Sequence, residues 1–259
     1  MALLKDRKGL VFGVANDRSI AWHVARHLIA EGAACGFTHL PGEKMERRVR
    51  RTLESGGLFD AWLRPCDAAR DEDLDRVFDE AGRHFGSLDF VIHSIAFADR
   101  DYLRIGTFAD TPRAVFAQAC DISAYTLLAV AARARRLMPA GGSIVAMSYY
   151  GSEKVIPGYN VMGVAKAALE ATARYLAFEL GERGIRVNTL SPGPIRTLSA
   201  MAVGGIDEIF EWVERKAPLR RNVDAAEVGK AAVYLVSDLS SGVTGENMHV
   251  DAGFNVVGL

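Results

Sequence analysis

The sequence predicts one α/β domain built on a doubly wound, mostly parallel sheet. Short apolar runs alternate with longer stretches of helical period, which is typical of parallel strands joined by crossover helices. A length of 259 residues and a hydrophobic content of 49% suit a single domain that extends over residues 1–259. No internal repeat, low-complexity segment or linker interrupts this pattern. We therefore expect a Rossmann-type sheet of seven strands.

Each expected strand is a short apolar run bounded by turn-forming or charged residues. The runs are residues 9–14, 33–38, 61–66, 88–94, 142–148, 185–191 and 247–250. The expected helices are residues 19–31, 47–55, 71–85, 112–138, 159–180 and 227–237, and another begins at residue 206. In the first helix Ile20, Val24 and Leu28 share one face, and Gly32 ends it.

The composition excludes several classes of function. The formal charge is −1, and no run of five like charges suggests a nucleic-acid or polyanionic partner. Cys35, Cys66 and Cys120 lack the spacing of a metal or redox site, so we expect no metal and a reducing, cytoplasmic setting. No apolar stretch of membrane-spanning length lacks a charge or helix breaker, so neither a signal peptide nor a membrane association is expected.

The loop after the first strand is a candidate phosphate-binding turn. Gly13 lets the backbone turn closely, and the side chain of Ser19 can cap the helix that follows. The free N–H groups of that helix, from Ile20 onward, can face a pyrophosphate. Ala21 keeps the first helical turn slim. The loop lacks the spacing of the common three-glycine fingerprint, so an ordinary strand-to-helix turn explains it equally well.

Later strands also end in residues suited to a nucleotide. Asp67 can accept a hydrogen bond from an adenine amine, and its neighbours Cys66 and Ala68 complete that turn. The small residues of Ser94-Ile95-Ala96 let the backbone approach a ribose. Either segment alone is equally explained as a strand-end turn. Together they lie at the carboxyl ends of successive strands, where open α/β sheets bind ligands.

The end of the second strand favours NADH over NADPH. It reads Phe37-Thr38-His39-Leu40 and offers no arginine for a 2′-phosphate. Lys44, Arg47 or Arg48 could fold back to supply that charge, and no aspartate is present to bind the 2′-hydroxyl.

Two phenols and one amine give the most informative motif of the chain. Tyr159 and Lys166 are seven residues apart, so on a helix both leave the same face about 10 Å apart along the axis. That distance is too long for a direct pair but suits a shared ligand. Tyr149 lies ten residues upstream, and Pro157-Gly158 places Tyr159 near the start of its helix. The alternative is that Tyr159 and Lys166 only form the rim of an amphipathic helix and bind no ligand.

Taken together, these segments resemble the enoyl-[acyl-carrier-protein] reductases, divergent short-chain dehydrogenases of fatty-acid synthesis. The resemblance runs from Gly9 to Phe254 and includes Asp121-Ile122-Ser123 and the segment Ser191-Pro192-Gly193-Pro194-Ile195-Arg196-Thr197. Ordinary members place a tyrosine four residues before the lysine and a serine thirteen before that tyrosine. Met162 and Tyr149 occupy those positions here. The enoyl reductases instead have six residues between the tyrosine and the lysine, as between Tyr159 and Lys166 here, and a second tyrosine ten residues upstream, as at Tyr149.

The resemblance implies NADH-dependent reduction of a trans-2-enoyl thioester. Tyr159 would hydrogen-bond the thioester oxygen, Lys166 would hold the nicotinamide ribose, and Tyr149 would line the pocket. Ile195 would contact the nicotinamide carboxamide and Thr197 the pyrophosphate, although a strand-end turn also explains that segment. Lys166 and Leu40 complete the cofactor contacts. The substrate pocket would also include Ala98, Met162, Ala200, Met201 and Val203.

A flap at about residues 197–214 would cover the acyl chain, although an amphipathic edge of the fold would look similar. Its acidic helix departs from what an acidic carrier protein requires, so Arg215, Lys216, Arg220 and Arg221 are the expected carrier contacts, and acyl-coenzyme A remains an alternative donor. Residues 112–138 and 159–180 would pack across twofold axes of a homotetramer, or inside one subunit. Two other functions stay open: a reductase of ketones or other conjugated carbonyls, and a non-catalytic dinucleotide-binding protein.

Overall fold

A single seven-stranded sheet forms the centre of the computed structural model, which describes residues 2–198 and 200–258. Every neighbouring pair of strands is parallel, and the order across the sheet is β3-β2-β1-β4-β5-β6-β7. The strands are β1 Lys8–Phe12, β2 Ala34–His39, β3 Leu63–Pro65, β4 Phe90–His93, β5 Gly142–Met147, β6 Ile185–Pro192 and β7 Asn247–Val250. The predicted doubly wound fold is confirmed, with a sheet that is wholly parallel.

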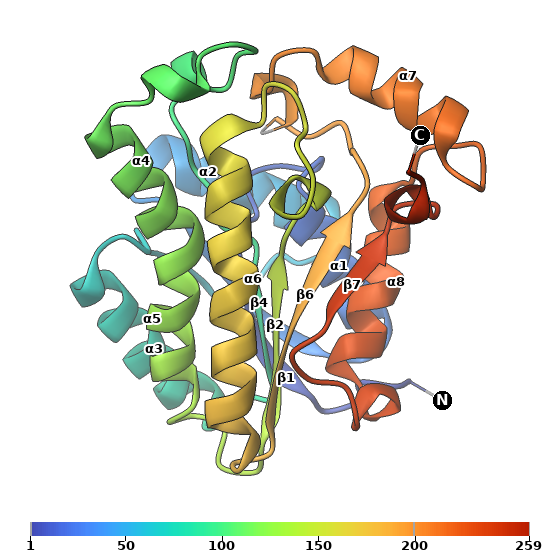
Figure 1. Ribbon diagram of the computed structural model, residues 1–259. Helices are drawn as coiled ribbons and strands as arrows, with labels where there is room; N and C mark the ends of the chain where they lie inside the picture. The colour runs from blue at the N-terminus through green and yellow to red at the C-terminus, as the bar shows by residue number, and fades with distance from the viewer. Residues whose placement is uncertain (1, 199, 259) are drawn as a thin grey trace.

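Helices cover both faces of the sheet (Figure 1). One face carries α3 (Asp71–Phe85), α4 (Arg113–Cys120), α5 (Thr126–Ala134) and α6 (Asn160–Gly181) over one apolar core. The other carries α1 (Ile20–Ala30), α2 (Glu43–Ser55) and α8 (Ala225–Val236) over a second core. Both faces of a parallel sheet must be covered, which explains why its strands read as continuous apolar runs. The helix α7 (Ile206–Lys216) lies above the carboxyl end of the sheet (Figure 1).

Helix boundaries differ from the sequence prediction where local caps decide them. α2 begins four residues earlier than expected, after Gly42 at φ 120°, and Glu43 and Glu46 lie in its first turn. α8 begins at Ala225 because Asp224 and Glu227 form a capping box. The edge strand β3 is shorter than predicted and ends at Pro65, which an edge strand tolerates.

The long helix predicted at residues 112–138 ends earlier and contains an irregular turn. A π-helical turn (Asp121–Tyr125) separates α4 from α5, and α5 ends at Ala134. Ser123 in this turn bonds the backbone of Phe97 in the loop after β4, and Thr126, the first residue of α5, contacts Nε2 of His93 at the end of β4 at 2.8 Å. Such turns are frequent at functional sites.

The helical stretch Arg113–Ala134 is long and apolar enough to meet the length and composition criterion for a membrane span. It packs on α3 and α6 in the fold, and 44% of its apolar window is buried. Core helices of soluble proteins meet the same criterion, so the stretch carries no evidence for a membrane.

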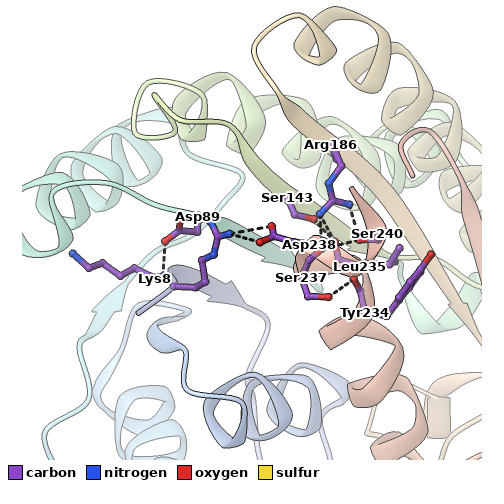
Figure 2. A network of polar contacts seen from close by, with 10 residues as sticks. Lys8, Asp89, Ser143, Arg186, Tyr234, Leu235, Ser237, Asp238 and Ser240 are labelled. Atoms are coloured by element: carbon purple, nitrogen blue, oxygen red, sulfur yellow. Dashed lines mark hydrogen bonds and ion pairs between the residues drawn. The ribbon is translucent and has the colours of Figure 1, made fainter. Parts of the chain in front are cut away.

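A polar network fastens the amino-terminal edge of the sheet (Figure 2). Arg186 in β6 donates to the carbonyl oxygens of Leu235 (2.9 Å) and Ser237 (3.3 Å) at the end of α8, and Ser143 in β5 also donates to Leu235 O at 2.7 Å. Arg7 pairs with Asp238 at 3.0 Å. These donors satisfy carbonyls that a helix end leaves free. This network lies at the edge opposite to the carboxyl edge, where open α/β sheets bind ligands.

Candidate active site

The candidate site lies at the carboxyl edge of the sheet, where four strand ends meet. β1 and β4 are neighbours although they are not consecutive, so the strand order reverses between them. Open α/β sheets bind ligands in the crevice at such a reversal. The loops after β1, β4, β5 and β6 hold most of the residues that the sequence singled out.

Gly13 brings the loop after β1 against the loop after β4. Its φ is +100°, and a Cβ built on it would lie 2.0 Å from the carbonyl oxygen of Ser94. Ser19 accepts hydrogen bonds from the backbone N–H groups of Ala15 and Asn16, both at 3.0 Å. The expected side-chain cap by Ser19 is therefore wrong, because its hydroxyl shapes the loop instead. The first N–H groups of α1, from Ile20 onward, remain for an anion.

The ends of β2 and β3 form the outer part of the crevice. Leu40 is 53% exposed, as a surface for an adenine or ribose requires. Asp67 closes a turn, in which its Oδ1 accepts from Ala69 N at 3.1 Å and its own N–H donates to Asp73 at 2.9 Å. Its second carboxylate oxygen is left for a ligand. Cys66 is buried, and burial raises the pKa of its thiol to about 12, so it is unreactive near neutral pH.

Tyr149 and Tyr159 form an aromatic pair beside the end of β5. Their ring centroids are 4.8 Å apart with an interplanar angle of 70°, an edge-to-face arrangement. Tyr159 is the residue immediately before α6, as the sequence predicted. Neither hydroxyl bonds to any other residue that the structure describes. Burial raises the pKa of Tyr149 to about 12 and that of Tyr159 further, so both phenols are neutral donors at physiological pH.

Lys166 lies two turns into α6 and is only 5% exposed. Its Nζ donates to the carbonyl oxygen of Met147, the last residue of β5, at 2.6 Å. Burial lowers its pKa to about 8, and the charge of Glu170 opposes this fall. The ammonium keeps further donors beyond the one that Met147 occupies. The tyrosine pair and the lysine thus stand at the same strand end.

Asn160, which the sequence did not single out, holds a neighbouring loop. Its φ is +44°, unusual for a residue with a side chain. Its Nδ2 donates to the carbonyl oxygens of Tyr102 at 2.8 Å and Arg104 at 2.7 Å. Gly204 N donates to Leu103 O at 3.0 Å in the same loop. Asn160, the residue after Tyr159, therefore connects the start of α6 to the loop that lies beneath the expected flap.

The expected flap region begins with a short turn and continues into α7. Thr197 Oγ1 accepts from Ala200 N at 3.0 Å, which starts a 3-10 turn (Ala200–Ala202). Arg196 pairs with Asp207 at 2.8 Å and lies over the ring of Phe210 at 4.4 Å. A cavity of about 660 Å³ lies between this segment and the loop after β1, lined in part by Arg18, Ile195, Arg196 and Phe210.

The predicted substrate residues divide into a buried and an exposed group. Ala98 and Met162 belong to a small apolar cluster against which Tyr159 packs. Met201 is 54% exposed on the turn above. A separate groove of about 540 Å³ has a lining that includes Ile105, Ile209 and Trp212 and none of the predicted substrate residues. The sequence did not single out these three residues, because their proximity depends on the packing of distant segments.

The residues of the crevice fit a dinucleotide. A glycine loop and a free helix N-terminus suit a pyrophosphate, the exposed Leu40 and Asp67 suit an adenosine, and the ammonium of Lys166 suits ribose hydroxyls. Ser94 N donates to Phe12 O at 3.3 Å, which holds the start of the Ser94-Ile95-Ala96 segment beside the end of β1, and Ile195 lines the cavity of about 660 Å³. Within the described ranges 2–198 and 200–258, no cluster of histidine, cysteine or carboxylate residues could hold a metal ion.

Comparisons with known proteins agree on one family. The profile of the family described as enoyl-(acyl carrier protein) reductase matches residues 13–255. The enoyl-[acyl-carrier-protein] reductase [NADH] 1 of Rhizobium meliloti is 51% identical and aligns over 99% of this chain and 93% of its own length. The Bacillus cereus enoyl-acyl carrier protein reductase, solved with NADP+ and indole naphthyridinone, superposes with a TM-score of 0.96 at 49% identity over 100% of both chains. The Anaplasma phagocytophilum reductase, solved with NAD, gives 0.94 at 46% identity over 99% of this chain and 97% of that one.

Proposed function

This chain belongs to the enoyl-[acyl-carrier-protein] reductase family, and we propose that its carboxyl-edge site reduces the trans-2 double bond of enoyl thioesters with NADH, as fatty-acid elongation requires. The single observation that carries the proposal is the placement of Tyr149, Tyr159 and Lys166. Two phenols whose hydroxyls bond to none of the described residues lie beside one buried ammonium at the end of β5.

Tyr159 stabilises the oxygen on which charge develops. NADH, held by the crevice residues, would supply a hydride to the β-carbon of the enoyl thioester, and negative charge would then develop on the thioester oxygen as an enolate. A neutral phenol donor in a dry pocket is favourable there, because it strengthens as the charge forms. The raised pKa of Tyr159 keeps its proton in place. Tyr149 packs edge-to-face on that ring and fixes its orientation. The reduction is completed when the α-carbon takes up a proton.

Lys166 orients the cofactor. Its ammonium would hold the nicotinamide ribose hydroxyls while it retains Met147 O, and its charge also favours the developing enolate. Ile195 would meet the carboxamide through its backbone, and Thr197 would reach the pyrophosphate. The loop of Gly13, Ser19 and Ile20 would receive the same pyrophosphate.

NADH is favoured over NADPH because the end of β2 offers the uncharged Leu40. The basic residues that could supply a 2′-phosphate contact, Lys44, Arg47 and Arg48, are exposed on α2. The complex of the Bacillus cereus relative with NADP+ shows that this fold can accept the phosphorylated cofactor. Comparing kcat/KM for NADH and NADPH measures the preference directly.

The enoyl group would enter beneath the flap from a carrier protein. The apolar groove beside Ile209 and Trp212 suits an acyl chain. Arg221 is paired with Glu227 at 2.6 Å, which leaves Arg215 and Lys216, both over Trp212, as the better contacts for an acidic carrier. Acyl-coenzyme A is the alternative donor, and turnover of both thioesters by an Arg215→Ala variant separates the two.

A homotetramer in the cytoplasm completes the proposal. Tyr175 and Phe178 on α6 are 79% and 88% exposed, and Leu128 on α5 is 43% exposed. Large apolar side chains exposed on these two packed helices suit packing across a twofold axis. Light scattering of the purified protein measures its mass, and a monomer would contradict this part.

The decisive experiment is a substrate comparison in one assay. We expect NADH oxidation with a graded series of trans-2-enoyl thioesters and little with 3-ketoacyl thioesters. Robust ketone turnover without enoyl turnover would instead identify a carbonyl reductase, and NADH binding without any turnover would identify a dinucleotide-binding protein. All three proteins would bind the cofactor, so the substrate that is turned over distinguishes them.

A further inference from the structure

Glu170 is a buried carboxylate to which the mechanism above gives no task. It lies on α6 one turn after Lys166 and is only 6% exposed. Burying a carboxylate is costly unless hydrogen bonds satisfy it. Three neutral groups do so at one oxygen: the hydroxyls of Ser148 and of Ser152 (2.5 Å), and the amide of Asn247 (3.2 Å).

The two serines lie on either side of Tyr149. Ser148 precedes it, and its backbone N–H donates to Leu190 O at 2.6 Å. Ser152 N donates to the carbonyl oxygen of Tyr149 at 2.9 Å. Because both hydroxyls converge on the same oxygen of Glu170, the carboxylate closes the turn from which the Tyr149 ring projects onto Tyr159.

Lys166 and Glu170 act on consecutive residues of the same strand end. Lys166 holds the carbonyl of Met147, and Glu170 holds the hydroxyl of Ser148. The carboxylate charge opposes the effect of burial, which lowers the pKa of Lys166. One helix thus positions both the phenol turn and the ammonium.

The other ionisable groups around this cluster carry little charge toward it. His93, from β4, is buried, and burial together with Lys166 lowers its pKa to about 3, so it is neutral. Tyr159 is neutral because its pKa is raised. Farther out, Glu153 lies 3.0 Å from His249 Nε2 and accepts from Asn247 at 2.9 Å. Of these groups, Glu170 is the one whose charge raises the pKa of Lys166.

Resting on the proposed function, we propose that Glu170 is a positioning residue with two effects: its charge keeps Lys166 protonated for the cofactor ribose, and its bonds to Ser148 and Ser152 fix the turn that carries Tyr149. It touches neither cofactor nor substrate. Its contribution acts through Lys166 and Tyr149.

The variant Glu170→Gln removes the charge of this side chain and keeps its size and shape. The three donors meet one oxygen, so a glutamine can keep that acceptor while losing the charge. We expect NADH affinity, followed by nucleotide fluorescence, to fall about fivefold at pH 8 and to change little at pH 6, because a fall of one unit from a pKa of about 8 lowers the protonated fraction of Lys166 at pH 8 by roughly that factor. Glu179→Gln, an exposed carboxylate on the same helix that pairs with Arg135, is the matched control and should leave the profile unchanged.

Ser152→Ala tests the second effect with the charge retained. We expect a several-fold lower kcat for the enoyl thioester and an unchanged pH profile of NADH binding. A wild-type profile in a folded Glu170→Gln protein would overturn the electrostatic effect, and a wild-type kcat in Ser152→Ala would overturn the positioning effect. If the wild-type protein reduced no enoyl thioester, the proposed function would fail, while the NADH binding profiles would still decide the role of the Glu170 charge.

Discussion

Burial and function oppose each other at the ammonium of Lys166, which makes it the most informative position to perturb. Lys166→Met keeps the length and apolar body of the side chain and removes both the charge and the 2.6 Å bond to Met147 O. The fall of its pKa from 10.5 to about 8 corresponds to roughly 3 kcal/mol by which the folded protein disfavours the ammonium. The lost charge-assisted bond is worth roughly 1.5–3 kcal/mol. The two nearly cancel, so we expect almost unchanged stability.

For NADH binding, no gain in free energy offsets the loss of the bond between the ammonium and the ribose. A bond from the ammonium to a ribose hydroxyl is again worth roughly 1.5–3 kcal/mol, so the dissociation constant should rise about 10- to 150-fold. Fluorescence titration with NADH and a thermal melt measure the two quantities in one protein sample. The exposed Lys154→Met is the control. Lys166→Ala should weaken binding and rate together, and wild-type NADH affinity in either Lys166 variant would refute the ribose assignment.

The pH dependence of the same lysine has a definite sign. Below pH 8 the ammonium is present in both the folded and the unfolded protein, and its burial cost is fully expressed. Between pH 8 and 10.5 the unfolded chain holds the proton and the folded protein has lost it, so this group raises the free energy of unfolding as pH increases. NADH affinity should fall over the same interval. Affinity that rises with pH there would contradict the assignment.

Four further changes test other parts of the structure. Tyr159→Phe should lower kcat roughly 10²- to 10³-fold and leave NADH affinity intact, and unchanged single-turnover rates would rule out its role as oxyanion donor. Asn160→Gly suits the φ of +44° but lacks the amide, so it should raise KM for the enoyl thioester. A wild-type KM would show that the bonds from Asn160 to the neighbouring loop do not affect substrate binding. Gly13→Ala places a methyl 2.0 Å from Ser94 O and should weaken NADH binding at least about tenfold, measured by titration. Arg186→Met should lower the free energy of unfolding by roughly 3 kcal/mol in denaturant titrations, because it removes the charged donor of the bonds to Leu235 O and Ser237 O, with kcat unchanged. An unchanged denaturation midpoint would show that the network in Figure 2 contributes no stability.

Some of the site could be predicted because it depends on spacing within one element. Tyr159 and Lys166 share a helix face by their separation alone, and the glycine loop follows directly from the end of a strand. The alternation of apolar runs and helical periods was enough to predict the doubly wound sheet, since each period is a property of consecutive residues. Boundaries were less well predicted where a cap such as Asp224 or a π-turn intervened.

The sequence by itself therefore determined the fold class, the cofactor-binding edge and the phenol–amine pair of this protein. Only the tertiary structure decided that Glu170 meets Ser148 and Ser152, and that Asn160 holds a loop more than fifty residues away in sequence. Periodicity describes which face a side chain occupies, whereas the partner on that face is set by strand order, register and packing between distant segments. Those contacts in turn fix the charge and orientation of the residues that the spacing had identified.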